Sequence, residues 1–242
     1  MKQTLQLSEQ VTQRLLQEIQ SGIYFNYNRL PSEVEIAEYL GVSRTVIRDC
    51  LAVLEREGFI SRKHGVGTII NRHVINVKTR IDLEQEFLEM IESTGQKAKI
   101  AYADVRDINA DKQIAEKLHI KEDEPIFQVV RMITADDKPA ILCTDHIAKK
   151  LLKETKYNTE ELKLPIFHFL RKYCHVEVYM DLTEVKAVGA DETVAEFFHI
   201  DVGSPLLYMD EVGYNFKGTP VLYSQEYYMD GILKHMMLRK KI

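Results

Sequence analysis

The sequence contains no tryptophan, only six prolines and three cysteines, and no long apolar run. No stretch approaches the roughly 18 consecutive apolar residues that a membrane-spanning helix needs. The first ten residues also lack the apolar core and cleavage site of a signal peptide. Cys50, Cys143 and Cys174 are odd in number and far apart, which indicates neither a disulfide framework nor a structural zinc site. We therefore expect a cytoplasmic protein that uses no metal, no cofactor and no membrane.

The chain has 242 residues, 45% of them hydrophobic and 29% charged, which suits one large domain or two small ones. Its net charge of -5 argues, taken alone, against a nucleic-acid partner. The charge is unevenly distributed, however. Residues 1–73 hold nine basic and eight acidic side chains, whereas residues 74–242 hold 23 and 29. The acidity belongs to the second part, so a local basic face is possible in the first.

The N-terminal segment predicts three short helices followed by a hairpin. Ser8 is expected to cap the first helix, which ends near Gly22. Ser32 and Glu35 have the spacing of a capping box at the start of the second helix. Ser43 is expected to cap the third, whose apolar positions follow helical spacing at Ile47, Cys50, Leu51 and Leu54. Strands at residues 59–63 and 68–70 then surround a glycine-rich bend.

Two helices joined by a short glycine-containing turn are typical of a helix-turn-helix, whose second helix enters the DNA major groove. Arg44, Thr45 and Arg48 would project together from the start of that helix. Exposed arginines are often merely solvated, but the neighbouring hairpin favours a DNA-binding role. Arg62 and Lys63 either improve solubility or contact phosphates, and His64 is either simply exposed or a DNA contact. Cys50 is expected to be a core residue rather than a redox sensor.

Four motifs support a more specific interpretation: L-P-S-E at residues 30–33, V-S-R-x-x-x-R at 42–48, E-G at 57–58 and G-x-G-T at 65–68. Together they resemble the winged helix-turn-helix of the GntR family of bacterial transcription regulators, across residues 8–70. The resemblance implies DNA contacts from the recognition helix and the wing. The candidates are Ser43, Arg44, Thr45, Arg48, Arg62, His64, Gly65 and Gly67. Val34 stands where many relatives carry an arginine that contacts DNA, so the resemblance does not carry that contact over to this chain.

The second part contains a duplication. Residues 110–125 and 190–205 agree at seven of sixteen positions at an offset of eighty, including A-D, A-E, H-I and P. Each copy predicts a strand, a short helix, a turn and then a two-stranded hairpin, and a further helix is expected near residues 164–174. His119 and His199 hold matching places, where they are expected to cap or pack a helix end rather than bind a metal. This order of elements predicts an α+β domain with a mostly antiparallel sheet.

The two copies place charged residues at equivalent strand positions. Arg131 corresponds to Glu211, and Asp145 corresponds to Glu226. Charges within otherwise apolar strands are costly unless they are paired or solvated. They could pair with each other, line a polar cavity or face water, and a ligand cavity is the interpretation that we favour.

This second part resembles the UTRA effector-binding domain of the HutC subgroup of GntR regulators, which has a chorismate lyase-like fold. The resemblance rests on G-Q near residue 95, the hairpin from Arg131 to Pro139 and P-V-x-Y-S-x-E-Y-Y at residues 220–228. Relatives that sense sugar phosphates carry an R-x-R pair where this chain has Arg131 and Ile133, and Pro165 stands where they often have serine. The candidate effector-binding residues are Arg131, Asp145, Glu211, Glu226 and Tyr228, for an effector bearing a carboxylate or a phosphate.

Two hypotheses follow. The first is a homodimeric repressor that binds a palindromic DNA operator and responds to a small-molecule effector. The second is an enzyme on a chorismate lyase-like fold that carries a DNA-binding head, although no catalytic triad, phosphate loop or metal-ligand spacing is present. The expected organisation is a winged helix-turn-helix at residues 1–72, a linker at 73–80 and an effector-binding and dimerisation domain at 81–242.

Overall fold

The computed structural model describes residues 2–83 and 85–240, with side chains from Leu7 onward. It divides into two compact units, one made of the chain up to Asp82 together with the segment from Met236 on, and the other running from Leu83 to His235. The C-terminal segment therefore lies with the first unit, whereas the sequence placed it with the second. The start of the expected linker is also structured, because α4 (Arg72–Ile75) occupies it.

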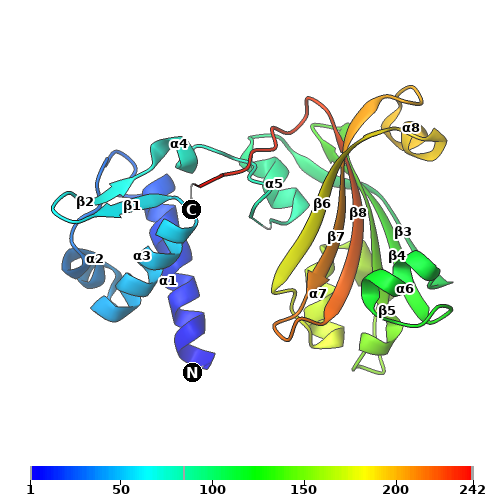
Figure 1. The fold of residues 1–242 in the computed structure, drawn as a ribbon, viewed down its shortest axis with the longest axis horizontal. Helices are drawn as coiled ribbons and strands as arrows, with labels where there is room; N and C mark the ends of the chain where they lie inside the picture. The colour runs from blue at the N-terminus through cyan, green and yellow to red at the C-terminus, as the bar shows by residue number, and fades with distance from the viewer. Residues whose placement is uncertain (1, 84, 241–242) are drawn as a thin grey trace. The chain divides into compact units, whose positions relative to one another are not determined.

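The first unit is a winged helix-turn-helix (Figure 1). It contains α1 (Lys2–Gln20), α2 (Glu33–Leu40), α3 (Arg44–Arg56), β1 (Ile60–Lys63) and β2 (Gly67–Ile70). The predicted capping box at Ser32 and Glu35 is present, and Ser43 caps α3 as predicted. Ser8 does not begin the first helix; it lies inside α1 because the helical segment extends to the second residue of the chain. The core is formed by buried apolar side chains that include Leu15, Ile19, Ile36, Ile47, Leu51, Leu54 and Ile60.

The second unit is built on a six-stranded sheet in the order β3-β4-β5-β8-β7-β6, in which every neighbouring pair is antiparallel (Figure 1). Its strands are β3 (Ala98–Asn109), β4 (Pro125–Ala135), β5 (Lys138–Ala148), β6 (Met180–Gly189), β7 (Pro205–Tyr214) and β8 (Pro220–Met229). Its helical segments are α5 (Phe87–Ser93), α6 (Lys112–Leu118), η1 (Lys149–Leu151), η2 (Thr159–Lys163), α7 (Ile166–Phe169), η3 (Leu170–Cys174) and α8 (Glu192–Phe198).

The duplication predicted from the sequence is confirmed in the order of elements. The first copy is β3-α6-β4-β5 and the second is β6-α8-β7-β8, so β5 and β8 meet at the centre of the sheet. The capping geometry repeats as well. Asp111 and Asp191 accept hydrogen bonds from the backbone at the start of α6 and α8, and His119 and His199 end these helices in the left-handed conformation. The two histidines are therefore helix-end residues, as predicted.

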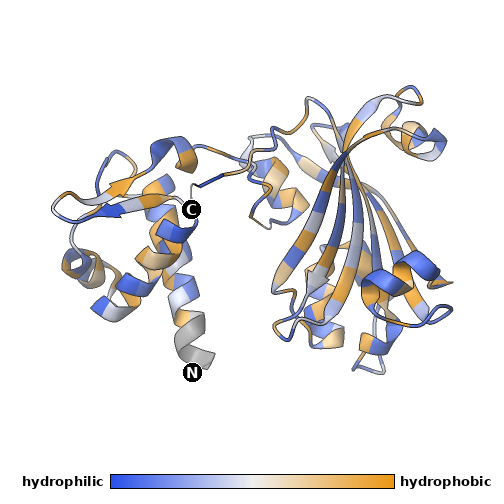
Figure 2. Cartoon of the chain, viewed as in Figure 1, coloured by the Kyte–Doolittle hydropathy of each residue, from blue (hydrophilic) through white to orange (hydrophobic). Residues whose placement is uncertain are grey.

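Side chains alternate along the strands between two faces, as the orange and blue bands in Figure 2 show. Helices α6 and α8 pack on one face, against residues such as Ile126 and Leu206. Segments α7 and η3 cover the other face, where Phe127 and Leu222 belong to the same apolar cluster as Phe169. Within residues 2–83 and 85–240, no helix is both long and apolar enough to cross a membrane.

Candidate functional sites

The first candidate site is the exposed N-terminal end of α3. Ser43, Arg44, Thr45 and Arg48 are all exposed there. The opposite face of the helix is buried through Ile47, Cys50, Leu51 and Leu54, so packing against α1 and α2 fixes the direction in which the polar face points. The backbone amide of Val46 donates to Ser43 Oγ at 3.3 Å, which assigns the serine a capping role in addition to any DNA contact.

The two arginines of this face are available to a partner. The side chain of Arg44 is 65% exposed, and its guanidinium lies 3.8 Å from the carboxylate of Glu33. An exposed ion pair at this distance contributes at most about 1 kcal/mol, so a phosphate could replace Glu33 at little cost. Arg48 makes no hydrogen bond or ion pair with any residue that the structure describes. Val34, at the position where relatives carry arginine, is also exposed.

The wing is the second part of this site. Gly65 and Gly67 have φ angles of +74° and +95°, and an added Cβ would meet no atom within 4 Å at either position. The bend therefore needs glycine for its backbone conformation, not because side-chain space is lacking. His64 is exposed at the tip. Arg62 instead donates to Glu55 on α3 at 2.7 Å, so it ties the wing to the recognition helix.

The other end of α3 is held by residues that no sequence motif singles out. Lys240 Nζ donates to the carbonyls of Glu55 and Arg56, at 2.6 and 2.7 Å. Arg80 donates to the carbonyl of Glu57 at 2.7 Å. The last carbonyls of a helix lack partners within the helix and favour cations. Both arms leading to the second unit, residues 79–82 and 236–240, thus bind the C-terminal end of the recognition helix.

These two arms also pair with each other. The amide of Ile81 donates to the carbonyl of Met236, and the amide of Met236 donates to the carbonyl of Thr79, in a parallel bridge. Arg72, at the start of α4, donates to the carbonyl of Ile19 at 2.9 Å. The segment expected to be a linker, residues 73–80, is therefore held on the first unit by Thr79 and Arg80 at its end, and Arg72 makes a further contact just before it.

Gly58 lies against the C-terminal arm, and it provides a test of that contact. Its φ angle is +81°, and an added Cβ would lie 2.2 Å from Leu238 Cδ2. We expect Gly58→Ala to destabilise the first unit by about 1–2 kcal/mol, through left-handed strain and displacement of Leu238. Gly41→Ala is the matched control, because its φ is +69° with no atom within 4 Å. Thermal unfolding should show a larger loss for Gly58→Ala, and equal losses would contradict the contact.

The second candidate site lies on the face of the sheet that α7 covers. Four of the five predicted effector residues line one small hollow there: Arg131, Asp145, Glu211 and Glu226. Ser224 and Leu222 from β8, and Glu86 and Phe87 at the start of α5, complete its wall together with Gln85, Ile166 and Phe167. Tyr228, the fifth predicted residue, does not line the hollow but donates its hydroxyl hydrogen bond to Glu226. Glu86 was missed at the sequence level, because it lies outside the repeats.

The strand register explains why these residues meet. Arg131 lies opposite Cys143, and Glu211 lies opposite Ser224, at equivalent places in the two hairpins. Asp145 and Glu226 follow two residues further along β5 and β8, and Cys143 pairs with Glu226 across the centre of the sheet. All of these positions therefore share one face. The residues that the repeat made equivalent therefore lie together near the centre of the sheet, where the two copies meet.

Arg131 is committed to an ion pair at the centre of the site. Its guanidinium bonds with Asp145, and the two side chains are 4% and 2% exposed. Arg131 also donates to the carbonyl of Leu164 at 3.0 Å. Asp145 accepts further hydrogen bonds from Ser224 Oγ at 2.6 Å and Cys143 Sγ at 3.3 Å. The sequence left three alternatives for these charges: pairing, lining a cavity or facing water. Arg131 and Asp145 pair with each other, and both also line the hollow.

Two more polar residues extend the cluster onto β6. Thr183 donates its hydroxyl hydrogen bond to Glu211, its neighbour in register. Asp181 lies two residues away on the same strand, and one of its oxygens is buried without a hydrogen-bond partner among the described residues. Burial, reinforced by the Glu211 carboxylate, raises the pKa of Asp181 to about 7. Asp181 therefore holds its proton more strongly than an exposed aspartate does.

This raised pKa predicts a pH-dependent stability. Because the folded form binds the Asp181 proton more tightly than the unfolded chain does, stability decreases as pH rises from about 4 towards 7. We expect Asp181→Asn to match the parent near pH 4 and to be more stable at pH 8, by on the order of 1–2 kcal/mol after allowance for solvent screening. Glu184→Gln, on the same strand and 64% exposed, is the control. Melting temperatures across this pH range test it, and a constant difference would contradict it.

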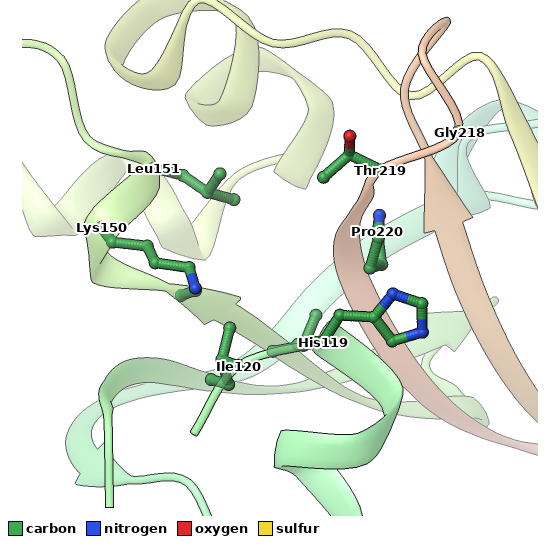
Figure 3. Close-up of a pocket in the computed structure, with 9 residues that line it drawn as sticks. His119, Ile120, Lys150, Leu151, Gly218, Thr219 and Pro220 are labelled. Atoms are coloured by element: carbon green, nitrogen blue, oxygen red, sulfur yellow. The ribbon is translucent and has the colours of Figure 1, made fainter. Parts of the chain in front are cut away.

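A larger hollow of about 210 Å³ lies elsewhere in the second unit, beside the end of α6, η1 and the loop before β8 (Figure 3). His119, Lys150, Leu151 and Pro220 line it. Lys150 forms an ion pair with Glu124, at 3.3 Å, so its ammonium group is partly neutralised. None of the effector residues predicted from the sequence lines this hollow.

Comparison with known proteins identifies both units. Residues 7–70 match the model of the gntR family of bacterial regulatory proteins, and residues 93–230, more than half of the chain, match the UTRA domain. YurK of Bacillus subtilis, described as an uncharacterized HTH-type transcriptional regulator, is 25% identical over 89% of this chain and 88% of its own length. The HTH-type transcriptional repressor NagR of the same species is also 25% identical, over 90% and 88%.

Solved structures agree with the fold. The crystal structure of YydK from Bacillus subtilis, described as a possible transcriptional regulator, has a TM-score of 0.74, with 23% identity over 95% of this chain and 99% of that one. PhnF from Mycobacterium smegmatis has a TM-score of 0.59, with 18% identity over 88% and 92%. The similar proteins are regulators, which favours the regulator hypothesis over the enzyme hypothesis. This chain belongs to the GntR family of bacterial transcription regulators, in the HutC-type subgroup whose winged helix-turn-helix is joined to a UTRA domain.

Proposed function

We propose that this regulator is a homodimeric repressor that binds a palindromic operator and whose DNA affinity is controlled by a small molecule bound at the Arg131 cluster. The observation that carries the proposal is the placement of Gln85, Glu86 and Phe87. They line the hollow at the cluster and follow Asp82, the end of the first unit, after only two residues. We infer that a ligand that displaces this segment acts through the short connection on the arm at residues 79–82, which binds the end of α3.

The proposed control of DNA affinity uses the two ends of α3 differently. Its N-terminal end carries the exposed arginines, and its C-terminal end is held by Arg80 and Lys240. A ligand changes operator affinity only as far as it binds differently to the two arrangements of the arms. The sequence-based expectation of an effector with a carboxylate or a phosphate depended on Arg131 as its binding group. Asp145 already neutralises that guanidinium, so Arg131 is not a free anion site.

An exposed apolar edge supports the homodimer. Within the part of the chain that the structure describes, strand β6 pairs with β7 and ends the sheet. Tyr179, Met180, Leu182 and Val185, on or beside this strand, are 44% to 69% exposed. An exposed edge strand with apolar side chains is a ready surface for another chain, and a two-fold symmetric protein matches the symmetry of a palindromic operator.

Leu182→Asp tests the dimer. The substitution adds charge to the most exposed residue of this edge, so we expect the dimer to weaken at least tenfold, measured by sedimentation. Operator affinity should fall with it, because the two half-sites are then bound independently. Val202→Asp is the control, since Val202 is 64% exposed but lies in the turn before β7. If Leu182→Asp leaves the parent dimer unchanged, another surface makes the contact.

The function as a whole is tested by selecting DNA ligands from a random duplex library with the purified protein. Two inverted half-sites separated by about one helical turn are the expected result. A gel shift with the selected duplex then identifies compounds that change its affinity. Selection of single or direct-repeat half-sites would contradict the palindromic mode, and failure to select any sequence would contradict the proposal.

A further inference from the structure

The charges around the hollow at Arg131 are unbalanced. Among the described residues that line it, Arg131 is the one cation, whereas four carboxylates face the same space: Glu86, Asp145, Glu211 and Glu226. Asp145 neutralises Arg131 by direct pairing. Glu86 and Glu211 are not part of this pair, and they give the wall of the hollow an excess of negative charge.

Glu86 and Glu211 have few partners for their negative charge. The side chain of Glu86 makes no hydrogen bond or ion pair with any residue that the structure describes. Glu211 accepts one hydrogen bond, from Thr183. Burial raises the pKa of both carboxyl groups. Partly buried carboxylates with few partners are costly, and such groups are concentrated at ligand and functional sites.

A second, independent observation concerns hydrogen bonding. Arg131 is 3% exposed, and its Nε is buried without an acceptor among the described residues. The two terminal nitrogens of the same guanidinium are engaged by Leu164 and Asp145. A buried donor without an acceptor is uncommon in native proteins, because the lost hydration is not replaced. None of the described residues provides the oxygen that this nitrogen needs.

We propose that the effector is a small amino compound whose ammonium group binds between Glu86 and Glu211 and whose neutral hydroxyl or carbonyl oxygen accepts a hydrogen bond from Arg131 Nε. This inference rests on the proposed function, since it assigns a chemical class to the effector of the same site. A neutral oxygen suits Arg131 because Asp145 already balances its charge. A second anionic group would add to the excess of carboxylates.

Binding requires the hollow to open. Its free volume is about 20 Å³, which is room for roughly one water molecule. The apolar part of its wall is formed by Phe87 and Ile166, which begin α5 and α7, and by Phe167. An amino compound larger than water must displace one of these short helices, and only residues 83–86 separate α5 from the arm at residues 79–82.

The charge is tested with matched compounds on the full chain. The first set is 4-aminobutanol, 1,4-butanediol and 4-hydroxybutyrate, and the second is glucosamine, glucose and glucose 6-phosphate. Each set holds a skeleton constant and changes the charge from positive to neutral to negative. We expect a cationic member to raise the melting temperature by about 2 °C or more at saturating concentration, with no effect of its neutral and anionic counterparts. Stabilisation by an anionic member alone, or by no cationic member, overturns the inference.

Glu211→Gln localises the effect. The variant should lose the response to the cationic compound, whereas Glu184→Gln, an exposed carboxylate on β6, should keep it. Glu211→Gln should also melt higher than the parent at pH 8 without ligand, because it removes a partly buried negative charge that no described cation neutralises. A lower melting temperature would mean that Glu211 is held for structural reasons and would overturn the inference.

The same compounds in the operator gel shift separate the two proposals. If an anionic compound changes operator affinity, the regulatory function stands and the charge assignment is wrong. If a cationic compound raises the melting temperature without changing operator affinity, the charge assignment stands and the regulatory coupling is wrong.

Discussion

Replacing Arg131 by alanine is expected to lower the free energy of unfolding of the second unit by about 3–5 kcal/mol. The substitution leaves Asp145 buried at 1% exposure, and among the described residues Ser224 and Cys143 are then its hydrogen-bond donors. A buried carboxylate that loses its cation retains the full cost of leaving water. Urea unfolding followed by the fluorescence of the tyrosines, which are numerous in this unit, measures the change.

The matched control removes both charges. In Arg131→Met with Asp145→Leu, neither side chain needs a counter-charge, so most of the loss should be recovered. The double variant should also fail to respond to any effector, while its operator affinity without effector stays near that of the parent. A loss of less than about 1 kcal/mol in the single variant would mean that water reaches Asp145 and that the pair is not a buried one.

Replacing Arg44 or Arg48 by alanine is expected to weaken operator binding by about 1–3 kcal/mol for each hydrogen-bonded base that the arginine no longer reaches, or roughly 5- to 150-fold. Both side chains project from the exposed face of α3, and neither is held by a strong partner within the described residues. The buried face of the helix is unchanged by either substitution, so the fold should be unaffected. Gel-shift titration at a fixed salt concentration measures the weakening.

Arg56→Ala is the control for this pair. Arg56 lies in the last turn of the same helix, 74% exposed and paired with Glu57. Its removal changes net charge by the same amount, so a general electrostatic effect would weaken all three variants equally. Unchanged affinity in both Arg44→Ala and Arg48→Ala would contradict docking through the start of α3.

The features that the sequence predicted well are those fixed by neighbouring residues. Ser32, Ser43, Asp111 and Asp191 cap helices because a cap involves only the next few residues. The wing was predicted from its glycines for the same reason. The Arg131 cluster was predicted from more distant residues, but only because the duplication supplied the correspondence between the two hairpins.

The features that could not be predicted from the sequence depend on contacts between distant segments. Glu86 and Asp181 reach the cluster from outside the hairpins, and no local pattern distinguishes them from other acidic residues. The length of the first helix was underestimated, because Ser8 is a good cap that tertiary packing overrides; its hydroxyl lies near Cys50 Sγ in α3. The docking of Lys240 on α3 joins residues about 185 positions apart, beyond any periodicity.

That docking has a practical consequence for dissecting the protein. A fragment that ends at Asp82 contains every helix and strand of the DNA-binding head, yet it lacks Met236, Leu238 and Lys240. Its recognition helix would end with uncovered carbonyls, and Ile81 would lose its backbone partner. DNA affinities measured on such a fragment would understate those of the intact regulator. Supplying residues 236–240, on a flexible linker after Asp82, should restore the difference.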